Sequence, residues 1–499
     1  MAITKAQIIV TCEKIENSQT MSITFQIIVL KYVKKSHIIF LERKVYTMLV
    51  RFSVENFMSY KDRQVFSMIA GKQTKHKDHI FNANGKRVLK GSFFFGANAA
   101  GKSNLFKAIR FARDIALRGL RRNILTNMHF RIDEAYARKP GIFQFDIFTN
   151  GHFYSYGFSI SYEHAKIEEE WLYLCDSSDL AIFERSMEND QMVITTDFKF
   201  SNENQRQSFH VFSENVSDDK LFLSEIAERK LIEHPDFFAY RDVMKWLKGL
   251  MIILPNSKYR DKISLLTKGN HEDDLVKILQ EFDTGIEGIT LGEESMEETL
   301  DFLPEKVKAE LIQDIETSFH EVDPNHGTPK EINVEIAGRF LRFLKKENTI
   351  YASQLMMDHG NKDDPFELAD ESDGTQRLFD LIPVYRAGKT PRVILVDELD
   401  RSFHTKLVIR FIQKFFYTTC GIGSQLIASV HDSNVMDLDI LRQDEIWFVE
   451  RQEDHSTKIF SLNKFQARFD KKVSKDYLLG RYGAIPCFSQ IEDLDEEEI

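Results

Sequence analysis

The sequence predicts an α/β protein whose head combines a mixed sheet with an antiparallel lobe and carries a mostly helical insert. Three observations predict this class. An apolar run, a glycine-rich loop and an amphipathic helix follow one another over residues 88–117. Aromatic and polar residues alternate over residues 142–174, as is typical of antiparallel strands. Helical periodicity dominates residues 218–320, and apolar β-like runs return after residue 331.

Composition limits the class of protein further. With 499 residues, 42% of them hydrophobic, the chain can bury the cores of two or three domains. Its net charge of −11 weighs against a nucleic-acid binder without excluding a local basic groove. The four cysteines form no CxxC pair, so neither a zinc site nor a disulfide framework is predicted. No apolar run approaches the roughly 20 residues of a membrane helix, and no secretory pattern is visible. We therefore expect a cytoplasmic protein without a membrane partner.

Changes of pattern divide the chain into an N-terminal extension, a first half of the head, a helical insert, a second half of the head and an acidic tail, at residues 1–47, 48–210, 211–330, 331–488 and 489–499. The extension is either native or lies upstream of a true start at Met48. In the first half of the head, Asn150-Gly151 is a strong two-residue hairpin signal. In the insert, we expect Phe237, Phe238 and Trp246 to be core residues, with partner anchors as the alternative. The tail is expected to be solvated.

The stretch "GANAAGKS", residues 96–103, matches the phosphate-loop pattern GxxxxGK[ST]. Gly96 and Gly101 let backbone N–H groups close around phosphates, Lys102 neutralises the outer phosphates, and Ser103 binds Mg²⁺. The helix that follows directs its positive end toward the same anion. The loop predicts a nucleotide site, but kinases, GTPases, helicases and transporter ATPases all share it.

Three later motifs favour hydrolysis. The apolar run in "RVILVDELD" ends at Asp397-Glu398, where Asp397 would hold the Mg²⁺ shell and Glu398 would orient and deprotonate the attacking water. Upstream, "DESDGTQRLFDLIP" places Ser372 and Gly374 at a helix start, which is a second anion site. Downstream, "LIASVHDSNV" places His431 after another apolar strand, within reach of a γ-phosphate.

This order of motifs resembles the ATPase heads of the ABC superfamily, especially the SMC, RecF and OLD-like branch, in which an inserted arm separates the two halves of the head. Asn98 and Asn104 stand where the "GxNxxGKSN" loops of that branch have asparagines. Gln376 ends "ESDGTQ", which stands for the signature helix, and Asp400 stands where the D-loop follows. The resemblance covers Met48 to about Phe488.

Several stretches look most similar to prokaryotic AAA family ATPases of phage-defence loci, such as the PARIS subunit AriA and relatives in abortive-infection, Septu and retron modules. These stretches are "RFSVENFMSY", "DESDGTQRLFDLIP", "DELDRSFH", "DEIWFVE" and "YLLGRYGAIP". The resemblance implies ATP and Mg²⁺ as cofactors, and a homodimer or higher oligomer that closes on ATP and opens after hydrolysis. It implies two ATP molecules between two heads, with Lys102, Ser103, Asp397, Glu398 and His431 from one subunit and Ser372 and Gly374 from the other.

Two points depart from the family pattern. The signature reads Ser-Asp-Gly-Thr-Gln instead of the Ser-Gly-Gly-Gln of transporters. The glutamine loop is not placed, because several Gln and Glu residues between Gln144 and Glu170 would serve.

Two functions remain open at this point. The first is a sensor or scaffold ATPase of an anti-phage, abortive-infection system that controls a separate effector, a nuclease or toxin. Fewer than 110 residues follow Glu398, too few for the further nuclease domain of OLD-like proteins. The second is a RecF- or SMC-like repair ATPase that clamps DNA, with the basic stretches "RGLRRN" and "RFLKKEN" lining a groove. A transporter ATPase fits least, because the insert is too long, and Glu398 argues against a sensor that does not hydrolyse.

Overall fold

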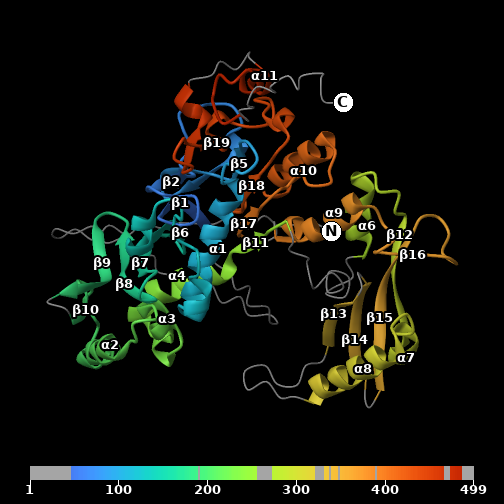
Figure 1. Cartoon of the computed structure of the whole chain (residues 1–499), viewed down its shortest axis with the longest axis horizontal. Coiled ribbons are helices and arrows are strands. Elements are labelled where there is room, and N and C mark those ends of the chain that lie inside the picture. Colours follow the sequence, from blue (N-terminus) through green and yellow to red (C-terminus); the bar gives the residue numbers. More distant parts are fainter. Residues whose placement is uncertain are drawn as a thin grey trace, which may run out of the picture. The chain divides into compact units, whose positions relative to one another are not determined.

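The computed structural model describes residues 46–188, 191–255, 272–320, 331–336, 339–346, 349–387, 390–465 and 472–485, and Figure 1 labels its elements. All described residues belong to a single unit. Of the predicted extension only the last two residues are described. The predicted acidic tail at 489–499 lies outside the described residues. Both stay predictions.

A mixed sheet forms the core of the head. Its strands, in spatial order, are β11 (Met251–Ile253), β17 (Val393–Val396), β18 (Gln425–Ser429), β5 (Gly91–Phe95), β19 (Ile446–Arg451) and β20 (Thr457–Ser461). Neighbours from β11 to β19 run parallel, and β20 pairs antiparallel with β19. Since both faces of a parallel sheet are covered, the central strands are buried along their whole length. This sheet confirms the predicted α/β class.

Helices cover both faces of the core sheet. Side chains alternate along β5, so that Phe94 lies in the hydrophobic core shared with α1 (Lys102–Arg118). Phe93 and Phe95 lie in the core shared with α9 (Asp373–Ala387) and α10 (Thr405–Thr418). The predicted apolar stripe of α1 is buried, at Leu105, Ala108, Ile109, Ala112, Ile115 and Ala116. The phosphate-loop pattern therefore lies between a buried strand and a buried helix, as predicted.

An antiparallel lobe contributes a second sheet. Its spatial order is β10 (Gln191–Thr195), β9 (Asp179–Glu188), β8 (Lys166–Cys175), β7 (His152–Ser161), β6 (Gly141–Thr149), β1 (Thr47–Glu55) and β2 (Gln64–Ser67). The predicted hairpin joins β6 to β7, because Asn150 and Gly151 have φ of 53° and 88° and Thr149 pairs with His152. Helices α2 (Glu203–Asn215), α3 (Phe222–Ala227) and α4 (Phe238–Gly249) pack on this lobe. Phe237 and Trp246 are buried there, which favours the core alternative.

The region predicted as a helical insert also contains strands. Its helices include α6 (Glu272–Glu281), α7 (Met296–Thr299) and α8 (Glu305–His320). However, β11 returns to the core sheet, and β12 (Gly288–Ser295) joins an antiparallel sheet with β15 (Thr349–Asp358), β14 (Arg339–Lys346), β13 (Glu331–Ile336) and β16 (Phe366–Glu367). We call this the arm sheet. Short runs such as "GITLGEES" lack a decisive period, and pairing with β15 makes this one a strand. The predicted domain boundaries stay predictions.

Three smaller features complete the described chain. β3 (Ile80–Ala83) and β4 (Lys86–Leu89) form a hairpin between β2 and β5 in the sequence. Helix α11 (Val473–Leu478) follows β20. Within the part of the chain that the structure describes, no helix has both the length and the apolar character needed to cross a membrane.

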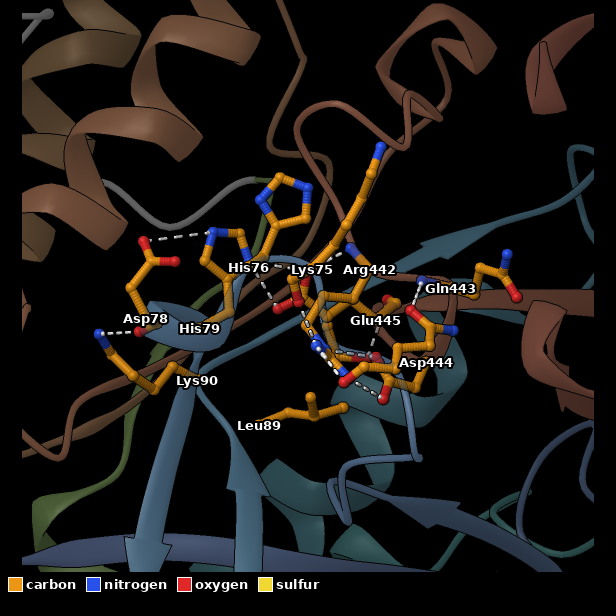
Figure 2. Close-up of polar contacts among 12 residues, drawn as sticks. Lys75, His76, Asp78, His79, Leu89, Lys90, Arg442, Gln443, Asp444 and Glu445 are labelled. Atoms are coloured by element: carbon orange, nitrogen blue, oxygen red, sulfur yellow. Dashed lines mark hydrogen bonds and ion pairs between the residues drawn. The ribbon is translucent and has the colours of Figure 1, made fainter. Parts of the chain in front are cut away.

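A cluster of buried polar side chains connects the segment before β3 with residues 442–445, which precede β19 (Figure 2). Arg442 is 0% exposed, and its Nε and Nη2 each donate to a carboxylate oxygen of Asp444 at 2.8 Å. Its Nη1 donates to the backbone oxygen of Lys75 at 2.5 Å. Asp444 also accepts from the backbone N–H of Gly71 at 2.6 Å. The charges of Arg442 and Asp444 are therefore paired and hydrogen-bonded away from water, which is the condition for burying them.

The same cluster contains a histidine and a glutamate. Oε1 of Glu445 lies 3.0 Å from Nδ1 of His79, and the His79 ring stacks on Phe416 with centroids 3.5 Å apart. Burial raises the pKa of Glu445, and His79 opposes that shift. The Glu445 carboxylate therefore lies directly before β19 and is held by His79, which directly precedes β3.

We expect Arg442→Met to lower the free energy of unfolding by about 3–5 kcal/mol, because it leaves the Asp444 carboxylate buried without its partner. Asp439→Asn is the matched control, since Asp439 makes an exposed ion pair with Lys75 at 3.4 Å. That pair should contribute about 0–1 kcal/mol. Urea titration of both variants measures the difference, and equal losses would contradict the assigned role of the buried pair.

A second buried carboxylate lies in the lobe. Glu170 on β8 is 0% exposed. It accepts from the backbone N–H groups of Phe222 at 2.6 Å and Leu223 at 3.1 Å, and from the hydroxyl of Tyr156 at 3.1 Å. Burial raises the pKa of Glu170 to about 7, although Arg185 and these hydrogen bonds oppose the shift. Folding therefore favours the protonated form of this side chain.

The raised pKa of Glu170 predicts a pH-dependent stability. Its contribution is complete below the ordinary value of 4.5 and is lost as pH rises through about 7. The thermal midpoint of the wild type, minus that of Glu170→Gln, should therefore fall between about pH 5 and about pH 8. Exposed Glu188→Gln should show a constant difference from the wild type. A constant difference for Glu170→Gln as well would rule out this titration.

Candidate active site

The loop between β5 and α1 closes around its own lysine. Nζ of Lys102 donates to the backbone oxygen of Gly96 at 2.7 Å and to that of Ala97 at 3.1 Å. The residue is 6% exposed. Burial lowers the pKa of the Lys102 ammonium, and the carboxylates that follow β17 oppose the shift. Two backbone carbonyls of the loop therefore accept hydrogen bonds from the Lys102 ammonium. Asp397, Asp400 and Glu398 lie near enough to stabilise its positive charge.

Glycine is required at two positions of the loop because other segments approach closely. A Cβ on Gly96 would lie 2.2 Å from a backbone oxygen of β19, and one on Gly101 would lie 2.2 Å from Oγ1 of Thr457. Gly101 also has a left-handed φ of 105°. Thr457 Oγ1 lies 2.7 Å from Oγ of Ser59, and the predicted residue Asn104 donates from Nδ2 to the same oxygen at 2.8 Å. Ser59 and Thr457, which lie far apart in the sequence, thus hold the phosphate loop on the side where Gly101 and Asn104 lie.

Asp397 directly follows β17 and is 1% exposed. Its Oδ1 accepts from Oγ of Ser429 at 2.6 Å, whereas its Oδ2 has no hydrogen-bond partner among the described residues. Burying a carboxylate oxygen without a hydrogen-bond partner costs free energy. A hard cation such as Mg²⁺ prefers oxygen ligands and would be a suitable partner. Ser103 supplies a hydroxyl at the start of α1. Ser103 and Asp397 therefore fit Mg²⁺, and the loop glycines fit a phosphate chain.

Glu398 follows in a backbone conformation that is unusual for its type, with φ of 54°. Such a conformation costs about 1–3 kcal/mol and persists where neighbours hold it. Its backbone N–H donates to Oγ of Ser429 at 2.7 Å. Its Oε1 lies 3.6 Å from Nε2 of His431. Oδ2 of Asp400 accepts from the backbone N–H groups of His431 and Asp432, each at 2.8 Å. The predicted base, switch histidine and D-loop aspartate thus form one contact group.

An open cavity of about 980 Å³ lies in front of these groups. The predicted site residues that line it are Gly96, Asn98, Glu398, Asp400 and His431. Lys102 and Asp397 lie behind them, buried at the ends of α1 and β17. No glutamine is among the described residues that line the cavity, so the glutamine loop stays unplaced. The cavity is large enough for a nucleotide.

The signature residues lie elsewhere. Oγ of Ser372 accepts from the backbone N–H of Thr375 at 3.2 Å and so caps α9. Nε2 of Gln376 donates to the backbone oxygen of Glu371 at 2.9 Å. A Cβ on Gly374 would lie 3.0 Å from the backbone of the loop after Asp400. None of the predicted residues Ser372, Gly374 and Gln376 is among the described residues that line the cavity.

Arg377 is a site residue that the sequence analysis missed. It is 5% exposed, and its Nη2 donates to the backbone oxygens of Asp397 at 3.3 Å and Glu398 at 3.4 Å. Its Nε and Nη1 have no hydrogen-bond partner among the described residues. Burial lowers the pKa of this guanidinium. The available signal was a charged residue within the apolar face of α9.

Two further contacts were also missed. Ser429 serves both Asp397 and Glu398, and its position at the end of an apolar strand was the only signal. The backbone N–H of Ala97 donates to the backbone oxygen of Ala484 at 3.0 Å, and the hydroxyl of Tyr477 donates to the same oxygen at 2.9 Å. One wall of the cavity is therefore formed by residues Tyr477, Leu478, Ala484 and Ile485.

Two solved structures are similar to most of the chain. One is an SMC head bound to the C-winged helix domain of ScpA, with 13% identity, a TM-score of 0.38, and coverage of 84% of this chain and 99% of that chain. The other is an SMC head domain from Thermotoga maritima, with 11% identity, a TM-score of 0.34, and coverage of 83% and 98%. Similarity at this level adds no weight to the fold, which rests on the strand order. A comparison with curated proteins gives no match.

A family model described as "AAA domain, putative AbiEii toxin, Type IV TA system" matches residues 92–437. The match begins in β5 and ends beyond His431, so it takes in the phosphate loop, the paired acids and the histidine. The phosphate-loop pattern between β5 and α1, with a mixed sheet beside an antiparallel lobe, agrees with the α/β architecture predicted for the head. Because the match spans more than half of the chain, this protein belongs to that family of AAA domains.

Proposed function

We propose that this chain binds and hydrolyses Mg-ATP, and that two or more copies use the cycle to hold and release a separate effector in an anti-phage, abortive-infection system. One observation carries the ATPase proposal. The phosphate loop and the pair Asp397-Glu398 meet at the same edge of the core sheet, in front of a cavity of about 980 Å³. A carboxylate oxygen of Asp397 there is buried and has no partner among the described residues.

The surroundings of each side chain support its role in hydrolysis. Lys102 exchanges its two carbonyl contacts for phosphate oxygens when a nucleotide enters. Ser103 and Asp397 would hold Mg²⁺, which would supply positive charge to stabilise the transferred phosphoryl group. Glu398 orients the attacking water and accepts its proton, while His431, 3.6 Å from that carboxylate, donates to the γ-phosphate.

The position of the signature supports a site that two copies complete. Ser372 and Gly374 do not line the cavity, and both lie at the start of α9, where backbone N–H groups favour an anion. In the proposed dimer these residues contact the γ-phosphate of ATP held by the other copy. Binding closes the two heads on each other, and hydrolysis removes the contact and releases them.

One observation supports the defence role: the family description names a toxin of a type IV toxin–antitoxin system. In this proposal the ATPase controls an effector on a separate chain, a nuclease or toxin. DNA clamping by the same dimer is the competing outcome of the second experiment below.

Lys102→Ala should weaken ATP binding about 30-fold or more, because charged hydrogen bonds to the phosphates are lost. Lys107→Ala is the matched control, since Lys107 lies on the same helix and is exposed. Titration with a fluorescent ATP analogue measures both affinities. Equal affinity of the wild type and Lys102→Ala would overturn the nucleotide site.

Glu398→Gln should keep ATP bound and the dimer closed, because the amide still fills the position of the carboxylate but accepts no proton. We expect tagged Glu398→Gln, expressed with its native flanking genes and held in Mg-ATP, to retain a stoichiometric second protein. Mass spectrometry and a nucleic-acid assay of the eluate identify what is retained. Recovery of DNA without a partner protein would replace the defence scaffold by the DNA clamp. Exposed Glu453→Gln is the control.

A further inference from the structure

The signature segment, residues 371–376, is attached to the arm sheet at its upstream end. β16 ends at Glu367, and its residues pair with β15 as Phe366 with Met357 and Glu367 with Met356. The carboxylate of Glu367 forms an ion pair with Nε of Arg339 on β14 at 2.8 Å. The strand that leads into the signature therefore contacts two neighbouring strands of the arm sheet, β15 and β14.

Leu368 extends this attachment into the protein core. It is 3% exposed and belongs to the same hydrophobic cluster as Ile289 of β12 and Leu355 and Met357 of β15. That cluster also contains the buried face of α9. The arm sheet and the signature helix thus share one core, and a shift of one is resisted by the packing of the other.

A histidine joins the arm sheet directly to the signature segment. His359 follows β15, and its Nε2 lies 2.6 Å from Oε1 of Glu371. Its Nδ1 lies 3.1 Å from the backbone oxygen of Gly285. The ring therefore bridges the arm sheet and the signature segment through its two nitrogens. The Glu371 side chain is 6% exposed and that of His359 is 28% exposed, so the contact lies at the edge of the protein with its carboxylate side buried.

Glu371 in turn fixes the residues that follow it. Its backbone oxygen accepts from Nε2 of Gln376 at 2.9 Å, and Ser372 begins the cap of α9 directly after it. One turn into α9, Arg377 reaches the backbone oxygens of Asp397 and Glu398. A continuous set of contacts therefore runs from the arm sheet through the signature segment to the acidic pair.

We propose that His359 and Glu371 are positioning residues that set Ser372 and Gly374 for the ATP of the second copy, so that the state of the arm sheet controls ATP-dependent assembly. The inference rests on the proposed two-headed site and assigns its regulation to one side-chain contact, that between His359 and Glu371. By linkage, a protein that binds the arm sheet and shifts this pair changes assembly, and assembly changes its affinity by the same factor.

The test compares His359→Phe, His359→Gln and His152→Phe in the Glu398→Gln background. Phenylalanine keeps a ring against Phe366 but removes both hydrogen bonds, whereas glutamine retains a donor for Glu371. His152 is the matched control, because it makes the same kind of pair with Asp176 at 2.7 Å in the antiparallel lobe. Sedimentation in Mg-ATP measures dimerisation. Titration at low protein concentration measures ATP binding by the monomer, and hydrogen exchange without nucleotide measures the protection of residues 366–376.

We expect His359→Phe to weaken dimerisation about tenfold or more, with the ATP affinity of the monomer unchanged and protection of residues 366–376 reduced. His359→Gln should restore most of the dimerisation, and His152→Phe should behave as the background does. Unchanged protection, or reduced protection with unchanged dimerisation, would overturn the inference while leaving the ATPase intact. A background protein that neither binds ATP nor dimerises would overturn the proposed function, and the inference with it.

Discussion

The parallel ladder of β5, β17 and β18 is the constraint on which the site depends. Ser429 pairs with Phe94, and Val396 pairs with Ala428, so the three strands end within a residue or two of one another. Parallel strands present their carboxyl ends at one edge, where ligands of open α/β sheets bind. The phosphate loop, the acidic pair and His431 come from distant parts of the sequence, and this backbone register alone brings them together.

The register buries charged side chains such as Lys102 and Asp397 at this edge. Hydrogen bonds from neighbouring groups offset the cost of removing these charges from water. Ser429 accepts from one backbone N–H and donates to Asp397, so a single hydroxyl supports both acids. Lys102 is buried against its own loop carbonyls. At this edge of the sheet, Oδ2 of Asp397 and Oδ1 of Asp400 are buried without a hydrogen-bond partner in the described chain, and the proposed nucleotide and metal would supply partners there. Most polar groups of the site thus have hydrogen-bond partners within the protein, and the few that lack one are available to bind a ligand.

Much of this could be predicted from the sequence, because the decisive signals are local. Glycines around a lysine, paired acids after an apolar run and Asn150-Gly151 between alternating residues each depend on a few neighbouring positions. What the sequence did not reveal depends on contacts between remote segments. Arg377 is recognisable only once α9 is known to face β17, and β12 is a strand only because β15 pairs with it. Ala484 acts through its backbone, which carries no side-chain signal.

The contact that Thr457 makes with the phosphate loop limits how early this loop can be completed during synthesis. Thr457 contacts the backbone of Ala100 across 357 residues, and β5 pairs on both sides with strands from the second half of the head. At about 5–20 residues per second, a ribosome needs on the order of 20–70 s to synthesise that interval. Throughout this time the nascent phosphate loop lacks its rear wall and β5 lacks both neighbours. The antiparallel lobe, whose strands are close in sequence, can fold first, whereas the proposed nucleotide site is complete only near the end of synthesis.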